Sequence, residues 1–128
     1  MVQVKIYGLE AIVSRRSALS DAIQTALTEA IDTPKAKRFQ RFIILNPEDF
    51  IFPGDRTNNY TIIEINMFAG RSTEAKKKLI RLLYQKISQT TDITPQDLEI
   101  TIIETPRSNW GIRGVTGDEL NINYKVDI

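Results

Sequence analysis

Hydrophobic and polar residues follow two different periods in the first third of the chain. Residues 2–7 alternate between apolar and polar or amphipathic side chains, which predicts a strand with one buried face. From residue 14 to residue 31 the apolar positions recur three and four residues apart, which predicts an amphipathic helix. Pro34 ends this helix, because its ring disfavours the helical conformation of the residue before it. Residues 39–45 are then predicted to form a second strand.

The same order of elements recurs in the second half of the chain. Residues 60–68 are rich in β-branched and aromatic side chains and predict a strand. Gly70 interrupts that strand, and Ser72 is a suitable cap for a helix that continues to about Gln89. A fourth strand is predicted at residues 98–103.

The two halves share a register. Thr94-Pro95 follows Thr33-Pro34 by 61 residues, and the same offset superimposes the apolar positions of the first strand of each half. This favours one βαβ unit used twice, at residues 2–45 and 60–103, over the alternative that any α/β chain places short strands before helices. Since parallel strands need a right-handed crossover, two such units predict an α/β (α+β) fold, in which a four-stranded mixed sheet carries two helices on one face. The other face is expected to be covered by self-association.

Two segments lie outside this repeat within what we expect to be one domain, residues 1–128. The connection at residues 46–59 contains Phe50, Ile51 and Phe52, so it either carries function or packs into the core. The extension at residues 105–128 contains a glycine-rich turn and then a clean alternation that predicts one more strand, with its apolar face formed by Leu120, Ile122, Tyr124, Val126 and Ile128.

The net charge and the missing residue types exclude several classes of function and of catalytic site. The net charge of +1 argues against nucleic-acid binding, which usually needs a basic patch. The absence of cysteine and histidine excludes disulfides, thiol nucleophiles and Ser-His couples, and it removes the commonest zinc ligands. We therefore expect no metal and no cofactor, with acid–base chemistry left to carboxylates, lysine, tyrosine or a chain terminus. No apolar run approaches the roughly 20 residues that cross a bilayer, so we expect no membrane association and a cytoplasmic location.

Several short motifs occur in a recognisable order. They are Arg38-Phe39-Gln40-Arg41, then Met67-Phe68-Ala69-Gly70-Arg71-Ser72 with Glu74-Ala75-Lys76, then Asn109-Trp110 before the glycine-rich turn. As a set they resemble the tautomerase superfamily, which has the fold of macrophage migration inhibitory factor, and especially its longer-chain branch of malonate semialdehyde decarboxylase-like proteins. The resemblance implies a β-α-β fold, usually a homotrimer, with active sites near subunit boundaries.

The chain departs from that family at three functional positions. The base of the family is normally a proline exposed at the amino terminus after removal of methionine, and Val2 stands at the matching position. The decarboxylase-like members carry an aspartate where Lys37 stands, and a further arginine where Ala69 stands. The resemblance thus implies that the anion-binding arginine, Arg71, is retained while the base and its acidic partner are not.

Arg71 and Ser72 form the first candidate site, for a small carboxylate. They precede a predicted helix, whose free N–H groups and positive dipole end attract anions. An arginine is electrostatically unfavourable at such a helix start, which favours an external anion as its partner over an ordinary surface position.

Val2 is the candidate catalytic residue, because removal of Met1 would give it a free α-amine. Such an amine has a pKa near ~8, which an arginine or burial lowers towards neutrality, and it then acts as a base or forms a Schiff base. The alternative is that Val2 is only the first core residue of its strand.

Five further residues are candidates for substrate binding. Trp110 either walls a pocket or anchors the tail, and Asn109 and Arg113 flank it as hydrogen-bond donors. Arg41 lies among apolar strand residues, which indicates a polar pocket or a subunit interface, and Lys37 is either a pocket cation or a solvated loop residue.

Together these features predict a tautomerase-like enzyme for a small 2-oxo or enol acid, or a decarboxylase-like relative. The replacement of the proline by Val2 keeps open a non-catalytic homotrimer that binds a small anion or a protein, and a purely structural role is the third alternative.

Overall fold

The alternating residues at the start of the chain form strand β1 (Val2–Gly8) in the computed structural model, which describes residues 1–120. The amphipathic segment forms helix α1 (Arg16–Ile31), preceded by a 3-10 helix at Glu10–Arg15 that the periodicity did not predict. The chain continues through β2 (Gln40–Ile44), β3 (Thr61–Phe68), α2 (Thr73–Thr90) and β4 (Leu98–Thr105). Ser72 caps α2, as predicted, by accepting a hydrogen bond from the Ala75 N–H at 3.1 Å.

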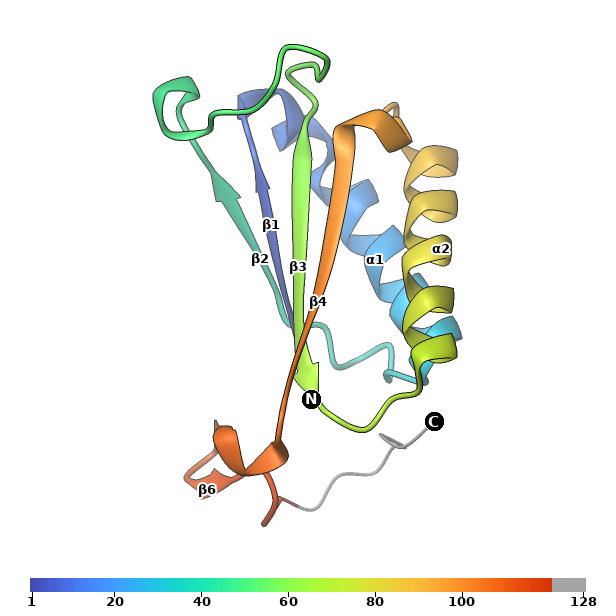
Figure 1. The fold of residues 1–128 in the computed structure, drawn as a ribbon, viewed down its shortest axis with the longest axis vertical. Helices are drawn as coiled ribbons and strands as arrows, with labels where there is room; N and C mark the ends of the chain where they lie inside the picture. The colour runs from blue at the N-terminus through green and yellow to red at the C-terminus, as the bar shows by residue number, and fades with distance from the viewer. Residues whose placement is uncertain (121–128) are drawn as a thin grey trace.

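The four strands form one mixed sheet in the order β2-β1-β3-β4. Strands β1 and β2 are parallel, as are β3 and β4, whereas the central strands β1 and β3 are antiparallel. Both helices cover the same face of the sheet (Figure 1). The predicted fold class, with two βαβ units, a four-stranded mixed sheet and two helices on one face, is confirmed.

The central pairing relates the two halves by an approximate two-fold axis. Val4 lies opposite Ile65, and these are the residues that the 61-residue offset superimposes. Val2 lies opposite Met67 and Ile6 opposite Ile63, so the pairing runs symmetrically outward from that point. A duplicated unit explains this register, although the duplication itself stays a prediction.

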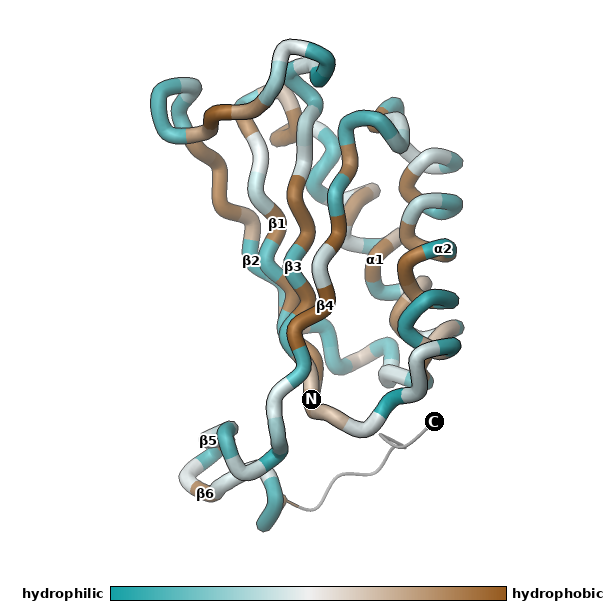
Figure 2. The backbone as a smooth tube through the Cα atoms, in the orientation of Figure 1, coloured by the Kyte–Doolittle hydropathy of each residue, from teal (hydrophilic) through white to brown (hydrophobic). Residues whose placement is uncertain are grey.

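The main core lies between the sheet and the helices. Every second residue of β1 and β3 points into it, together with one face of each helix. Ile6, Ile63 and Ile65 are fully buried there. Figure 2 shows the hydrophobic stretches along the strands and on the two helices that supply this layer. Burial of such side chains stabilises a fold by about 1.5–3 kcal/mol each.

The opposite face of the sheet has no helix over it within residues 1–120 (Figure 1). Polar side chains occupy its centre: the Tyr7 hydroxyl donates to Glu64 at 2.8 Å, and the Lys5 ammonium lies 3.5 Å from the same carboxylate. Apolar side chains share this face, including Ile103, which is 38% exposed. The face is therefore amphipathic and available to another protein surface.

The connection between the halves ends in an aromatic cluster. The ring centroids of Phe50 and Phe52 lie 5.4 Å apart, and those of Phe52 and Tyr60 lie 4.8 Å apart. Tyr60 is buried while the two phenylalanines are half-buried, which agrees with the packing alternative for these residues. Ile51 between them is 90% exposed. The connection reaches the start of β3 at the end of the sheet away from the amino terminus (Figure 1).

After β4 the chain forms a small hairpin, β5 (Gly111–Ile112) and β6 (Val115–Thr116). Arg113 and Gly114 form its two-residue turn with positive φ angles of 49° and 88°, as a tight hairpin of this type requires. The predicted strand from Leu120 to Ile128 lies, apart from its first residue, outside the described residues. No helix within residues 1–120 has the length and apolar character needed to cross a membrane.

Candidate functional site

Met1 lies at the amino end of β1 in a small apolar cluster with Phe68, Ile112, Trp110 and Leu120, and these surroundings of its α-amine are called the Met1 pocket below. Its carbonyl accepts a hydrogen bond from the Phe68 N–H at 3.3 Å, which extends the pairing of β1 with β3 by one residue. Met1 is only 7% exposed and clusters with Phe68 and Ile112, against which Trp110 and Leu120 pack. This cluster is separate from the main core, and it places the α-amine of Met1 among apolar side chains.

Trp110 forms one wall of that pocket. Its ring meets Phe68 edge to face, with centroids 5.2 Å apart and planes at 87°. Its indole N–H donates to the Thr105 hydroxyl at 2.7 Å, which fixes the ring relative to the end of β4. These contacts agree with the anchoring alternative for Trp110, and its role in substrate binding stays a prediction.

Arg71 is buried, with 5% of its surface exposed. Gly70 has a φ of 136°, and the turn that it permits directs the Arg71 guanidinium back to the carbonyl of Phe68, to which it donates at 3.0 Å. Arg71 therefore points towards the end of β3 and the Met1 pocket. Ser72, by contrast, is exposed, and its hydroxyl oxygen serves as the helix cap.

Arg107 is a second arginine at this pocket, and the sequence analysis missed it. Its guanidinium carbon lies 5.2 Å from the centre of the Phe68 ring, and its N–H groups donate to the carbonyls of Gly117 and Leu120 at 3.3 and 3.2 Å. It thereby ties residues 117–120 to the pocket. The available signal was its position just after β4, beside the end of the parallel strand β3.

The positive charges act on the amine of Met1. Burial, followed by the charges of Arg71, Arg107 and Lys37, lowers the pKa of this amine from 8.0 to about 5. At neutral pH the amine is therefore uncharged and has a free lone pair, which suits a proton acceptor or a nucleophile. The three cations around it favour an anionic ligand.

Val2 itself lies in the β1 ladder opposite Met67 and is almost fully buried. The amine in the pocket is that of Met1, so a catalytic amine on Val2 depends on removal of Met1. That role for Val2 stays a prediction.

The other candidates occupy different surroundings. Lys37 is half-buried and close enough for its charge to affect the Met1 amine. Asn109 ends a short 3-10 helix (Arg107–Asn109) and is exposed, and Arg113 is exposed in the turn between β5 and β6. The charges of Lys37 and Arg71 thus act on the Met1 amine, and Trp110 packs against the Met1 cluster, whereas Asn109 and Arg113 are exposed on the surface. A substrate-binding role for each of these residues stays a prediction.

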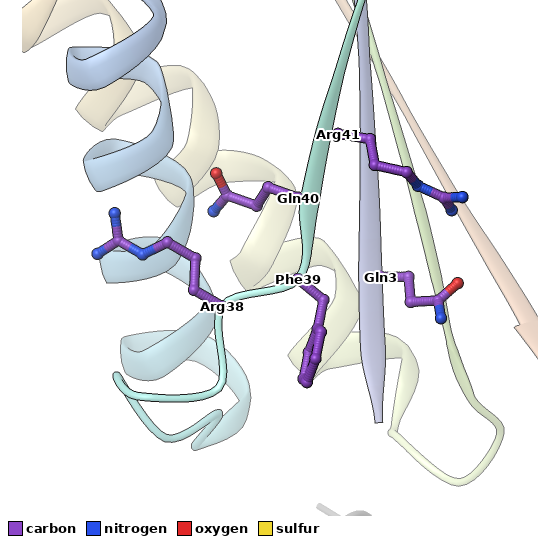
Figure 3. Close-up of a pocket in the computed structure, with 5 residues that line it drawn as sticks. All are labelled: Gln3, Arg38, Phe39, Gln40 and Arg41. Carbon is purple, nitrogen blue, oxygen red and sulfur yellow. The ribbon is translucent and has the colours of Figure 1, made fainter. Parts of the chain in front are cut away.

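Arg41 lines a shallow depression of about 340 Å³ beside the start of β2, together with Gln3, Arg38, Phe39 and Gln40 (Figure 3). Arg38 and Gln40 turn towards α1, where they donate to Asp21 at 2.6 Å and to the Ser20 carbonyl at 3.2 Å. Arg41 and Gln3 lie on the other side of the sheet (Figure 3). Arg41 therefore belongs to the face that no helix covers within residues 1–120.

Comparison with known proteins identifies the family. The family model described as tautomerase enzyme matches residues 37–113, which is more than half of the chain. The chain belongs to the tautomerase family. The resemblance of its motifs to that superfamily is thereby confirmed.

Relatives within the tautomerase family include 2-hydroxymuconate tautomerases. The chain is 35% identical to one from Pseudomonas putida over 57 residues, which cover 44% of this chain and 90% of that relative. It is 33% identical to one from Comamonas testosteroni over a segment of the same length.

Solved structures share the tautomerase fold. A fused 4-OT described as an asymmetric trimer superimposes with a TM-score of 0.79 at 22% identity, covering 91% of this chain and 96% of that one. Malonate semialdehyde decarboxylase superimposes with a TM-score of 0.77 at 18% identity, covering 86% and 89%. These superpositions establish the fold, and the longer-chain, decarboxylase-like members are among the structural neighbours.

Metal ligands are not assembled in the part of the chain that the structure describes. No group of three Asp or Glu side chains there is placed to hold a metal ion.

Proposed function

We propose that this tautomerase-family protein interconverts the enol and keto forms of a small 2-oxo acid at the Met1 pocket. The observation that carries the proposal is the convergence of Arg71, Arg107 and Lys37 on a buried, uncharged amine. The cations would hold the substrate carboxylate, and Trp110 would lie against the planar enol. The activities of the 2-hydroxymuconate tautomerases that the chain resembles support this choice of reaction.

The reaction requires one proton to move. The amine takes the proton from the enol hydroxyl, and the resulting ammonium returns a proton to the carbon of the former double bond, so that the amine is regenerated. Negative charge develops on the substrate oxygen between these steps, and nearby guanidinium groups stabilise it. If Met1 is removed, the amine of Val2 would take the same role, one residue further along β1.

The test is the rate of loss of enol absorbance with phenylpyruvate. Arg71→Ala should lower kcat/KM by about 10- to 100-fold, because a charge-assisted hydrogen bond contributes about 1.5–3 kcal/mol. The control is Arg81→Ala, which removes an exposed arginine from α2, the helix that Arg71 precedes. A second control adds two residues before Met1, which displaces the amine from the pocket and should abolish the proton transfer.

A ligand-binding protein without catalysis would behave differently. It would bind pyruvate-like acids, lose that affinity in Arg71→Ala, and leave the enol rate at the level of buffer alone. That result would replace our proposal with the non-catalytic, anion-binding alternative.

A further inference from the structure

We propose that the amine of Met1 forms an imine with the carbonyl carbon of a 2-oxo acid, so that the pocket is a covalent carbonyl-binding site. The inference rests on the pocket of the proposed function but uses different chemistry. In the proposed enol–keto reaction the amine transfers a proton, whereas in imine formation its nitrogen bonds to the carbonyl carbon.

The α-amine of Met1 is a primary amine, which is the type that forms a neutral imine. Methionine has a primary α-amine with two replaceable hydrogens, whereas proline has a secondary amine and gives only a charged iminium. In the step proposed, the nitrogen lone pair attacks the C2 carbonyl carbon, and the carbonyl oxygen takes up a proton to give a carbinolamine. The oxygen then leaves as water with both amine hydrogens, and a C=N bond remains. Amine plus ketone gives imine plus water, and no oxidant or reductant is needed.

The amine lies among apolar side chains and near positive charges. Phe68, Ile112 and Trp110 surround Met1 with apolar surface, and Met1 itself is 7% exposed. Among residues 1–120, the charged groups that act on the amine are Arg71, Arg107 and Lys37, and all three are cations. Nucleophilic amines in proteins are activated in this way, by desolvation and by a neighbouring positive charge.

A cation that binds the carboxylate of a 2-oxo acid would also orient its carbonyl group. The carboxylate of a 2-oxo acid is bonded directly to the carbonyl carbon. A cation that holds the carboxylate beside the amine therefore also brings the carbonyl carbon within reach of the nitrogen. Arg71 and Arg107 enter from the ends of adjacent strands, β3 and β4, and Phe68 contacts both of them. The pocket thus favours 2-oxo acids over neutral aldehydes and ketones of similar size.

The experiment is reductive trapping with pyruvate and cyanoborohydride at pH 6, read by intact mass and peptide mapping. At this pH an ordinary lysine amine, with a pKa of about 10.4, is protonated and unreactive. The amine of Met1 has a pKa of about 5, so it is mostly uncharged. We expect one reduced pyruvyl group per chain, located on the amino-terminal peptide.

Three controls identify the source of the reactivity. In urea the amine regains an ordinary pKa near ~8, so its uncharged fraction at pH 6 falls roughly a hundredfold and labelling should fall with it. Two residues added before Met1 should abolish the adduct. Arg107→Met should slow labelling by tenfold or more, whereas Arg81→Met, at an exposed site on α2, should not.

Binding is followed separately by the fluorescence of Trp110, the single tryptophan of the chain. Quenching by pyruvate without an adduct would overturn the imine and leave the proton-transfer function intact. An adduct confined to lysine side chains, or equal labelling in urea, would also overturn it. Neither quenching nor an adduct would contradict both proposals.

Discussion

The amine of Met1 and the arginines beside it show how burial and charge act together on one group. Burial alone disfavours the ammonium, and the nearby cations disfavour it further, so both causes lower the pKa in the same direction. Phe68 is at the centre of this arrangement. It is fully buried, its carbonyl accepts from Arg71, and its ring lies against Trp110 and Arg107.

The pH dependence of the enol reaction follows from that pKa. The free amine is the reactive form, so kcat/KM should rise as the pH passes about 5 and should be level by pH 7. Arg107→Met removes one of the charges that lower the pKa, and the inflection should move upward towards 8. A wild-type inflection near 8 would show that the amine is solvated and does not lie in the pocket as described.

Candidate residues were predictable where a local signal existed. Arg71 was found because an arginine at a predicted helix start is unusual, and Trp110 because it is unique and precedes a glycine-rich turn. Arg107 carries no local signal, since its role depends on the return of residues 117–120 to its guanidinium. The direction in which Arg71 points, back to Phe68, was equally beyond the sequence because it depends on the turn at Gly70.

At the level of the elements, the start of α2 lies directly after Arg71, the arginine of the candidate site. Its cap, Ser72, directly follows Arg71. The turn after β3 therefore positions both the Arg71 side chain and the first residue of the helix. The Ser72 hydroxyl oxygen satisfies the Ala75 N–H, which would otherwise lack a partner within the helix.

Ser72→Ala should lower the free energy of unfolding by about 1 kcal/mol, the usual contribution of a serine cap. The measurement is urea unfolding followed by circular dichroism. Ser88→Ala, at an exposed position inside the same helix, is the matched control and should leave stability nearly unchanged or slightly higher. If both variants behave alike, the cap bond contributes nothing measurable.

Periodicity predicted the helices and strands closely but not what joins them. The predicted strand at residues 60–68 differs from β3 by one residue, and the helix after Ser72 differs from α2 by one residue at its end. Burial of one face imposes these patterns locally. The 3-10 helix at Glu10–Arg15 and the hairpin of β5 and β6 escaped prediction, because their few residues form no periodic pattern.

At the scale of the whole molecule, the face of the sheet opposite the helices is the candidate surface for assembly. We propose that this face mediates a homotrimer, as the trimeric structures of similar fold suggest. The Tyr7–Glu64–Lys5 group lies at its centre, and Ile103 is on the outer strand β4. An interface here would bury both kinds of side chain.

Light scattering coupled to gel filtration should find a trimer at micromolar concentration. Ile103→Asp should shift the protein to monomer, because it would bury an unpaired charge in the interface. Val115→Asp is the matched control: Val115 is 40% exposed against 38% for Ile103, but it lies in β6, outside the sheet. A wild-type monomer, or equal masses for the two variants, would assign assembly to another surface or to none.

The approximate two-fold pairing of β1 with β3 relates two nitrogens of different chemistry. The offset that superimposes the halves places Ile62 where Met1 stands, and the nitrogen of Ile62 belongs to a peptide bond inside a strand. An amide has no basic lone pair, so joining the halves end to end leaves that end of the sheet without an amine. The aromatic cluster of Phe50, Phe52 and Tyr60 lies there instead. Under the predicted duplication, the two ends of the sheet would therefore differ in role: one would hold the amine that we propose for reaction, and the other would hold an aromatic cluster that only packs.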